Sequence, residues 1–182
     1  LRGQNKTVAV LAVDPSSPFS GGALLGDRIR MQRHASDEGV FIRSLGSRGN
    51  HGGLSRATRE VVKLYDAFGM DYVLVETVGV GQTELDIMEI ADTTVVILTP
   101  ESGDAVQTLK AGILEIADVF VVNKSDRDGA SLIQSELKAM LELDAHTATS
   151  WRPPVLLTEA VKDAGVADLM SVIADHRASL RE

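Results

Sequence analysis

The chain has 182 residues, a length that fits one globular domain with a sizeable buried core. Its formal net charge of −8 argues against a protein that binds nucleic acid by general phosphate neutralisation, since such binding needs a surplus of Lys and Arg. The chain has no cysteine and no apolar run long enough to span a membrane, so we expect a cytoplasmic protein without disulfides, thiolate metal sites or membrane association.

Short apolar segments alternate along the chain with longer segments of helical periodicity. Runs of β-branched and aliphatic residues predict strands at residues 7–13, 72–75, 94–98, 119–122 and 155–157, with a weaker candidate at 40–43. The spacing of apolar residues predicts helices at 54–68, 104–116, 131–143 and 166–180. Gly3 and Gly69 stand where helix-terminating glycines are expected. The alternation predicts an α/β fold with a doubly wound, mostly parallel sheet, in a single domain.

An acidic residue directly follows the first predicted strand. Asp14 begins the segment DPSSPFSGG, and a carboxylate at a strand end before a loop of small residues suits a magnesium or water-positioning role beside a phosphate. Asp27 follows in the segment LLGDRIR. Taken singly, either aspartate can instead cap a helix or form a turn.

A second acidic residue follows the strand at 72–75. Glu76 ends the apolar run YVLVE, which is the Walker B arrangement, in which the carboxylate orients magnesium or its water shell. Gly79 comes three residues later, where a glycine can bring its backbone amide close to a terminal phosphate. This segment therefore predicts a phosphate and magnesium loop.

The most specific motif is NKSD, which follows the strand at 119–122. Asn-Lys-x-Asp at a strand end is the guanine-reading element of GTPases. The carboxylate of Asp126 can accept hydrogen bonds from the ring N–H and the exocyclic amine of guanine, a pair that adenine does not offer. We expect the Lys124 side chain to lie across the base and Asn123 to hold the loop together. The alternative is an ordinary polar turn.

The last predicted strand ends in the residues LTEA. Thr158 and Ala160 resemble the segment that supports the base through a backbone N–H group. This signal is weak by itself and gains weight only beside NKSD.

A phosphate-binding loop of the form G-x-x-x-x-G-K-[ST] is missing from the sequence, which contains no Gly-Lys dipeptide. That loop normally supplies most of the phosphate contacts and a magnesium ligand. We therefore expect the first strand of the fold, the loop and most of the first helix to lie upstream of Leu1. Residues 1–6 would then be the last turn of that helix.

Long blocks of the sequence are similar to those of the MeaB/ArgK family, the bacterial relatives of the human methylmalonic aciduria type A protein. The blocks are AVDPSSPFSGGALLGDRIRM, FIRSLGSRG, VLVETVGVGQTE and LTPESGDAVQTLKAGILEIADVFVVNKSD. The resemblance implies a P-loop NTPase-like G domain that binds GTP or GDP with Mg²⁺. It also implies a GTPase that chaperones an adenosylcobalamin-dependent acyl-CoA mutase, usually methylmalonyl-CoA mutase, by gating cofactor loading and protecting the enzyme.

The resemblance also implies roles for individual residues. Asp14, Asp27 and Glu76 match the magnesium-site acids, and Asn123, Lys124 and Asp126 match the guanine readers. Residues 99–110 match a switch that relays the nucleotide state to the mutase, with Asp104, Gln107 and Lys110 as its polar relays. Read without the family, this stretch is equally well a strand end and a helix start capped by Ser102 or Asp104. The family's dimerisation arm would follow Glu182, so a homodimer is expected of the full-length form only.

Other functions stay open at this point. One is a nickel-insertion GTPase, which the absence of cysteine disfavours. Another is an accessory ATPase or kinase of an amino-acid transport system, and a third is a module that binds a mutase without hydrolysing nucleotide, the safer prediction for these 182 residues alone. No catalytic residue is assigned, although Gln82 is near enough to the expected phosphate loop to position water.

Overall fold

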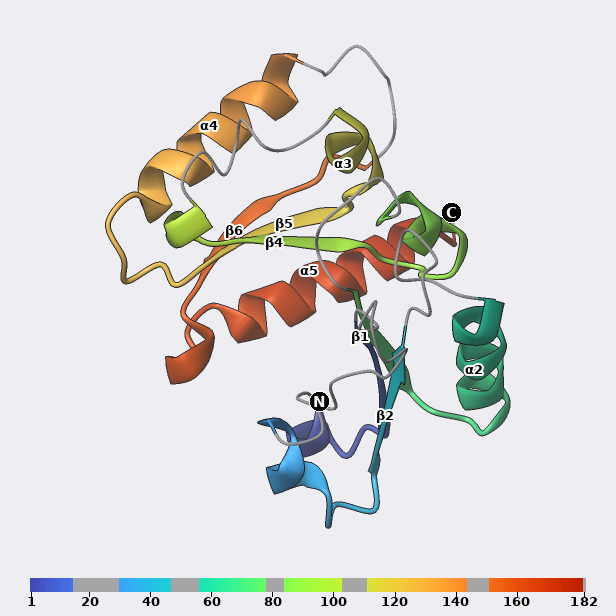
Figure 1. The fold of residues 1–182 in the computed structure, drawn as a ribbon. Helices are drawn as coiled ribbons and strands as arrows, with labels where there is room; N and C mark the ends of the chain where they lie inside the picture. The colour runs from blue at the N-terminus through green and yellow to red at the C-terminus, as the bar shows by residue number, and fades with distance from the viewer. Residues whose placement is uncertain (15–29, 47–55, 78–83, 103–110, 144–150, 182) are drawn as a thin grey trace, which may run out of the picture. The chain divides into compact units, whose positions relative to one another are not determined.

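The computed structural model describes residues 1–14, 30–46, 56–77, 84–102, 111–143 and 151–181. The chain divides into two compact units, Leu1–Ile90 and Ala91–Glu182 (Figure 1). Both units combine helices with parallel strands, as the alternation of apolar segments predicted.

The first unit is built on a three-stranded parallel sheet of order β2-β1-β3. The strands are β1 (Val8–Asp14), β2 (Val40–Gly46) and β3 (Tyr72–Glu76), and α2 (Arg56–Ala67) contacts β1 and β3. Three short 3-10 helices complete the described part, η1 (Arg2–Gln4), η2 (Gln32–His34) and η3 (Glu84–Glu89). β1 is the central strand, and its residues Ala9, Leu11 and Ala12 are 0% exposed.

Of the two glycines predicted to end helices, one does so and the other does not. Gly69 follows α2 with a φ of 77°, so the prediction of a glycine that ends this helix is confirmed. Gly3 lies inside η1, and the left-handed residue that ends η1 is Asn5, with a φ of 57°. The prediction for Gly3 was wrong because asparagine also tolerates the left-handed conformation.

The second unit is built on a three-stranded parallel sheet of order β4-β5-β6. The strands are β4 (Val95–Leu98), β5 (Val119–Asn123) and β6 (Val155–Thr158). The helices are α3 (Ala111–Ile116), α4 (Ala130–Leu143) and α5 (Val166–Ser179), with the 3-10 helices η4 (Pro100–Ser102) and η5 (Ala160–Lys162). In Figure 1 the strands of this sheet run between α4 and α5.

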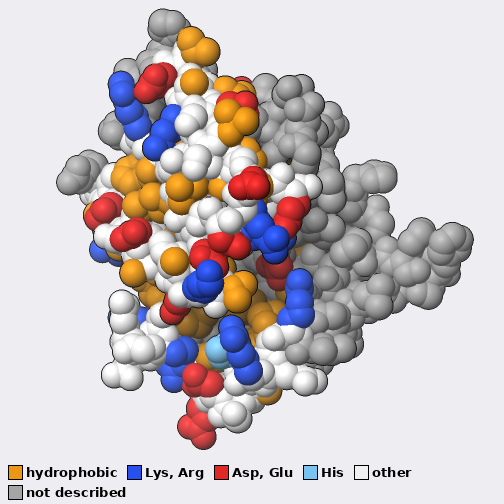
Figure 2. Space-filling model, turned by 90° about the vertical axis from the view of Figure 1, so that its left-hand side faces the viewer, with side chains coloured by type: hydrophobic (Ala, Val, Ile, Leu, Met, Phe, Trp, Pro, Cys, Tyr) orange, Lys and Arg blue, Asp and Glu red, His pale blue; other side chains and the backbone are white. Residues whose placement is uncertain are grey.

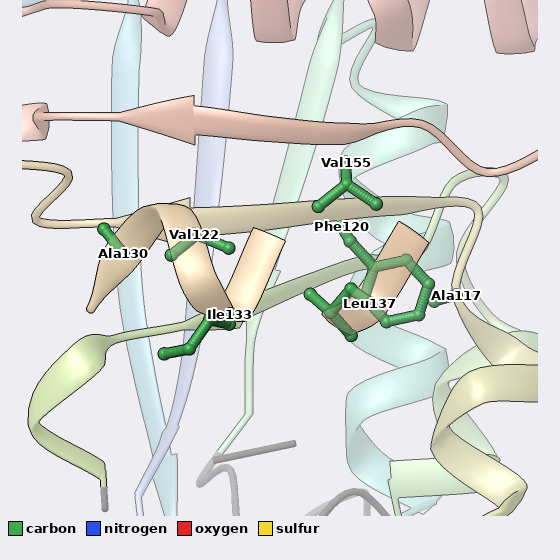
Figure 3. Close-up of a cluster of buried hydrophobic side chains, with 7 residues drawn as sticks. All are labelled: Ala117, Phe120, Val122, Ala130, Ile133, Leu137 and Val155. Atoms are coloured by element: carbon green, nitrogen blue, oxygen red, sulfur yellow. The ribbon is translucent and has the colours of Figure 1, made fainter. Parts of the chain in front are cut away.

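Packing of apolar side chains between β5 and α4 forms the core of the second unit. Phe120 of β5 and Leu137 of α4 are both 0% exposed and lie next to one another in Figure 3. Val119 and Val121 point to the opposite face of the sheet and are buried as well. Residues 119–122 of β5 are apolar because both faces of the strand are covered there. The cluster in Figure 3 comprises Ala117, Phe120, Val122, Ala130, Ile133, Leu137 and Val155.

The strands of the second unit begin at a buried polar network. His176 of α5 is 3% exposed, its Nδ1 lies 2.9 Å from Oγ1 of Thr93, and its Nε2 lies 3.3 Å from Oδ1 of Asp118. Asp118 also accepts a hydrogen bond of 2.7 Å from the backbone N–H of Thr94. The Trp151 ring lies 4.8 Å from the His176 ring, and its Nε1 donates to the backbone carbonyl of Asp118 at 2.9 Å. The network joins α5 to the starts of β4 and β5.

The strands of the first unit begin at a smaller polar cluster. Oδ2 of Asp71 accepts hydrogen bonds from the backbone N–H and the hydroxyl of Thr7, at 2.8 and 3.0 Å. The Thr7 hydroxyl oxygen in turn accepts the backbone N–H of Asp71, and Nζ of Lys6 lies 3.2 Å from Oδ1. These bonds tie the start of β1 to the start of β3.

Every predicted strand is present, and the weak candidate at 40–43 is a strand that extends to Gly46. The helix predicted at 104–116 is observed from Ala111 to Ile116, since residues 103–110 lie outside the described part. Within the part of the chain that the structure describes, no helix is both long and apolar enough to cross a membrane.

Candidate functional site

The side chain of Asn123, the last residue of β5, ties together the segments that follow two neighbouring strands. Asn123 is in register with Thr158, the last residue of β6. Its Oδ1 accepts hydrogen bonds of 3.1 Å from the Thr158 hydroxyl and 3.1 Å from the backbone N–H of Ala160. The backbone N–H of Ser125 donates to the Thr158 carbonyl at 3.0 Å. The structure thus brings the predicted residues Asn123, Thr158 and Ala160 together at one end of the sheet.

The loop after β6 is closed by its own backbone. Glu159 and Ala164 exchange two backbone hydrogen bonds of 3.0 and 3.2 Å. Gly165 follows with a φ of 74°, and a Cβ at this position would lie 2.3 Å from a backbone carbonyl oxygen of β6, so the position requires glycine. The Lys162 ammonium lies 2.6 Å from the Glu159 carboxylate, and this hydrogen bond raises the pKa of Lys162. The loop therefore holds a fixed shape beside Asn123.

Lys124 and Asp126 lie on the surface directly after β5. Lys124 has a left-handed backbone with a φ of 58°, and its carbonyl accepts the N–H of Arg127 at 2.9 Å, which turns the chain sharply. The side chains of Lys124 and Asp126 are 46% and 41% exposed. The side of the chain on which β4 and β5 end faces the viewer in Figure 2, where acidic and basic side chains lie among hydrophobic ones. The ammonium and the carboxylate can both reach a ligand in solvent.

Glu101 adds a carboxylate to this site that the sequence did not reveal. It belongs to η4, which follows β4, and it forms an ion pair with the Lys124 ammonium. Its second oxygen lies 3.9 Å from Nε of Arg127, which in turn lies 3.7 Å from a carboxylate oxygen of Asp126. The only sequence signal was an acidic residue just after a predicted strand, in the segment LTPES.

The first unit places two of the predicted magnesium-site acids at the same end of its sheet. Glu76 is the last residue of β3 and is in register with Ala12 of β1, while Asp14 ends β1 two residues further on. The Glu76 side chain is 53% exposed, and one of its oxygens lies 3.7 Å from Nη2 of Arg30. Carboxylates at neighbouring strand ends suit a hard cation such as Mg²⁺.

Other predicted residues lie outside the described part of the chain. They are the magnesium-site acid Asp27, the phosphate-loop glycine Gly79, the relays Asp104, Gln107 and Lys110, and the water-positioning candidate Gln82. Among the residues that are described, no group of three or more His, Cys, Asp and Glu side chains is placed to hold a metal ion.

Comparison with known proteins gives one family over the whole chain. The family model described as methylmalonyl-CoA mutase-associated GTPase MeaB matches residues 1–182. A Pyrococcus horikoshii protein named as a candidate GTPase is 52% identical over 183 residues, which cover 100% of this chain and 58% of that protein. GTPase ArgK of Escherichia coli is 38% identical, with coverage of 95% and 53%. The methylmalonic aciduria type A homolog, mitochondrial, of Mus musculus is 39% identical, with coverage of 96% and 43%. The chain spans about half the length of the curated relatives it matches.

Solved structures give the same fold. The crystal structure of LAO/AO transport system kinase matches with a TM-score of 0.76 and 30% identity, over 100% of this chain and 52% of that one. HypB from Helicobacter pylori in complex with nickel matches with a TM-score of 0.63 over 97% of this chain and 77% of that one. The second match is 15% identical and shows a shared α/β fold only.

Proposed function

The chain belongs to the family of methylmalonyl-CoA mutase-associated GTPases, and we propose that its strand-end loops bind guanine nucleotide in a GTP-hydrolysing chaperone of an acyl-CoA mutase. In the full-length protein, GTP binding and hydrolysis would gate the loading of adenosylcobalamin and protect the mutase. The observation that carries the proposal is the loop after β5, in which Asn123 is tied to two neighbours while the Asp126 carboxylate stays exposed.

Guanine recognition follows from the chemistry of this loop. The two oxygens of Asp126 would accept the ring N–H and the exocyclic amine of guanine, two charge-assisted hydrogen bonds. Adenine presents no such pair of donors, so the carboxylate would lose its hydration without replacement. The Lys124 stem would cover one face of the base. Asn123 would act indirectly, because its Oδ1 is already used to hold Thr158 and Ala160.

Magnesium would be held at the strand ends of the first unit. Glu76 and Asp14 end neighbouring parallel strands, which fits a cation that takes one or two carboxylates together with water and phosphate oxygens. When bound, Mg²⁺ would neutralise charge that builds up on the phosphate oxygens. The role of Glu76 would be to orient the ion or its water shell, as in a Walker B segment.

Hydrolysis would proceed by attack of water on the γ-phosphorus, with cleavage of the bond to the bridging β–γ oxygen and departure of GDP. The 182 residues contain no P-loop motif, so we propose that hydrolysis is a property of the longer protein and that this stretch alone binds nucleotide weakly. Residues 99–110 would relay the nucleotide state to the mutase, and the longer protein would form a homodimer.

The test is a change of base specificity in the full-length protein. Asp126→Asn replaces one carboxylate oxygen with a donor amide, so binding of GDP should weaken by roughly 100-fold while xanthosine diphosphate, which carries an oxygen in place of the amine, should bind better. Calorimetric titration with GDP, xanthosine diphosphate and ADP, each with Mg²⁺, measures the change. Asp128→Asn is the matched control, since Asp128 is an exposed aspartate in the same turn outside the motif.

Retention of GDP affinity in Asp126→Asn would contradict the guanine-reading proposal. Equal binding of ADP and GDP by the unaltered protein would do so as well.

An accessory ATPase or kinase of a transport system is the second candidate, favoured by the structural match to a protein named LAO/AO transport system kinase. It predicts preference for ATP and transfer of phosphate to a protein, which radiolabelled γ-phosphate detects. A third candidate is a mutase-binding module that hydrolyses nothing, for which a mutase complex would form equally well with GDP, a GTP analogue or no nucleotide. A nickel role finds no support in a chain without cysteine.

A further inference from the structure

The ion pair between Glu101 and Lys124 joins the segments that follow two different strands. Glu101 lies in η4 directly after β4, and Lys124 directly follows β5. The side chains are 48% and 46% exposed, so this is a surface pair with solvent access. Within the described residues, the ion pair with Glu101 is the one that the Lys124 ammonium makes.

The pairing of β4 with β5 places Glu101 near Lys124. β4 and β5 are parallel neighbours with Leu98 in register with Val122, so the residues after both strands emerge side by side. Pro100 also lies close to the turn that follows Lys124. A Cβ atom built on Gly129 in that turn would lie 4.0 Å from the Cβ atom of Pro100. The carboxylate of Glu101 is thus held near Lys124 by the sheet.

The backbone of the base-reading loop has its own supports. Asn123 holds the segment after β6, and the N–H of Ser125 bonds to the Thr158 carbonyl. The long, flexible side chain of Lys124 takes no part in these bonds. A lysine that must lie across a base loses side-chain entropy on binding, and a partner that orders it beforehand reduces that loss.

We propose that Glu101 is a positioning residue for guanine nucleotide that acts through the ammonium of Lys124. The inference rests on the proposed function, since it assigns Lys124 to the face of the base. In this proposal, Glu101 accepts a hydrogen bond from the ammonium at the far end of the Lys124 side chain. The aliphatic stem of Lys124 is thereby held extended, so that it can pack against the face of the guanine ring. Arg127 lies near both carboxylates, with its Nε 3.9 Å from Glu101 and 3.7 Å from Asp126.

A double-mutant cycle in the full-length protein tests this. The variants are Glu101→Gln, which keeps the size of the side chain and removes its charge, Lys124→Met, which keeps the stem and removes the ammonium, and the two combined. Calorimetric titration with Mg²⁺ and GDP gives Kd, and thermal unfolding gives Tm. Glu136→Gln is the matched control, since Glu136 is an exposed glutamate on α4.

Glu101→Gln should weaken GDP binding by about 3-fold, as fits an exposed ion pair, with Tm unchanged. In the Lys124→Met background the same change should leave Kd unaltered, because the ammonium through which Glu101 acts is gone. A purely structural role would lower Tm and would act equally in both backgrounds.

The outcomes separate the inference from the function beneath it. If the unaltered protein does not bind GDP, the proposed function fails and the inference fails with it. If it binds GDP but Glu101→Gln leaves Kd unchanged, tightens binding, or acts equally in both backgrounds, the inference on Glu101 is overturned while guanine binding stands.

Discussion

The two ends of the β4-β5-β6 sheet both carry polar side chains but use them in opposite ways. At the strand starts, both ring nitrogens of His176 contact protein atoms, and the ring is 3% exposed. At the strand ends, Asn123 accepts hydrogen bonds from Thr158 and Ala160. The Asp126 carboxylate there is 41% exposed and lies beside the surface side chain of Arg127. The first end is closed and the second is open to a ligand.

In the first unit the two ends differ in hydrogen bonding, while both carboxylates have solvent access. Asp71 at the strand starts is 36% exposed and accepts two hydrogen bonds from Thr7, whereas Glu76 at the strand ends is 53% exposed and lies 3.7 Å from Arg30. In parallel α/β sheets, ligands bind at the carboxyl ends of the strands. A polar side chain that is buried and fully bonded stabilises the fold, while an exposed acceptor held on a fixed loop can bind a ligand. Variants at both ends of the two sheets test that distinction.

His176→Ala should act on stability and leave nucleotide affinity unchanged. It removes a buried ring and leaves Thr93 and the half-buried Asp118 without their partner, so we expect a loss of about 2–4 kcal/mol in the free energy of unfolding. Denaturant titration measures the loss, and GDP titration of the folded protein should give the same Kd. Arg177→Ala, at an exposed position next in sequence, is the control. A large change in Kd would show that the strand starts of this sheet also contribute to nucleotide binding.

Asn123→Ala should act on nucleotide affinity more than on stability. The change frees the Thr158 hydroxyl and the N–H of Ala160, so the loop would no longer be held for the base. Two lost hydrogen bonds predict weakening of GDP binding by about 1–3 kcal/mol, or roughly 5- to 150-fold. Calorimetry gives the Kd, with Gln4→Ala as an exposed amide control. An unchanged Kd would mean that the loop is held by its backbone alone.

Glu76→Gln extends the comparison to the first unit. The neutral amide is a poorer magnesium ligand, so the Mg²⁺ concentration that half-maximally tightens GTP binding should rise roughly 10-fold. GDP binding without Mg²⁺ should not change. Titration of fluorescent GTP with Mg²⁺ measures both, and Glu38→Gln, at another exposed glutamate, is the control. Equal Mg²⁺ requirements in both proteins would remove Glu76 from the proposed metal site.

Asp71→Asn should change the acid sensitivity of the first unit by a small amount. The hydrogen bonds from Thr7, chiefly from its backbone N–H, hold the pKa of Asp71 below its usual value. A lowered folded-state pKa gives stability that is present above the unfolded value of about 3.8 and is lost as the pH falls through the folded value. Urea midpoints at pH 6 and pH 3 should therefore differ less in Asp71→Asn than in the unaltered protein. Asp66→Asn, at an exposed position on α2, should keep the full difference.

Asp37 contributes in the same direction, because its hydrogen bond from Arg2 lowers the pKa of Asp37. The double variant Asp37→Asn, Asp71→Asn should accordingly show the flattest response between pH 6 and pH 3. A response as steep as that of the unaltered protein would place the acid sensitivity elsewhere.

Local patterns in the sequence predict the strands, the longer helices and most of the site residues at the strand ends. β5 is buried on both faces, so its sequence is a continuous apolar run, and α4 shows helical periodicity in its own sequence. The bounds of both elements could therefore be predicted to within one residue. The same holds for Glu76 and Asn123, since each is the first polar residue after an apolar run.

Which residues come into contact across the sheet depends on the tertiary structure. Glu101 and Lys124 are 23 positions apart, and Thr93 and His176 are 83 apart, with no local pattern that links either pair. Strand order and register bring them together, and these depend on which strands pair across the sheet and which helices cover it. Periodicity reports the face that a residue occupies, but it carries no information on the neighbour that the sheet places beside it.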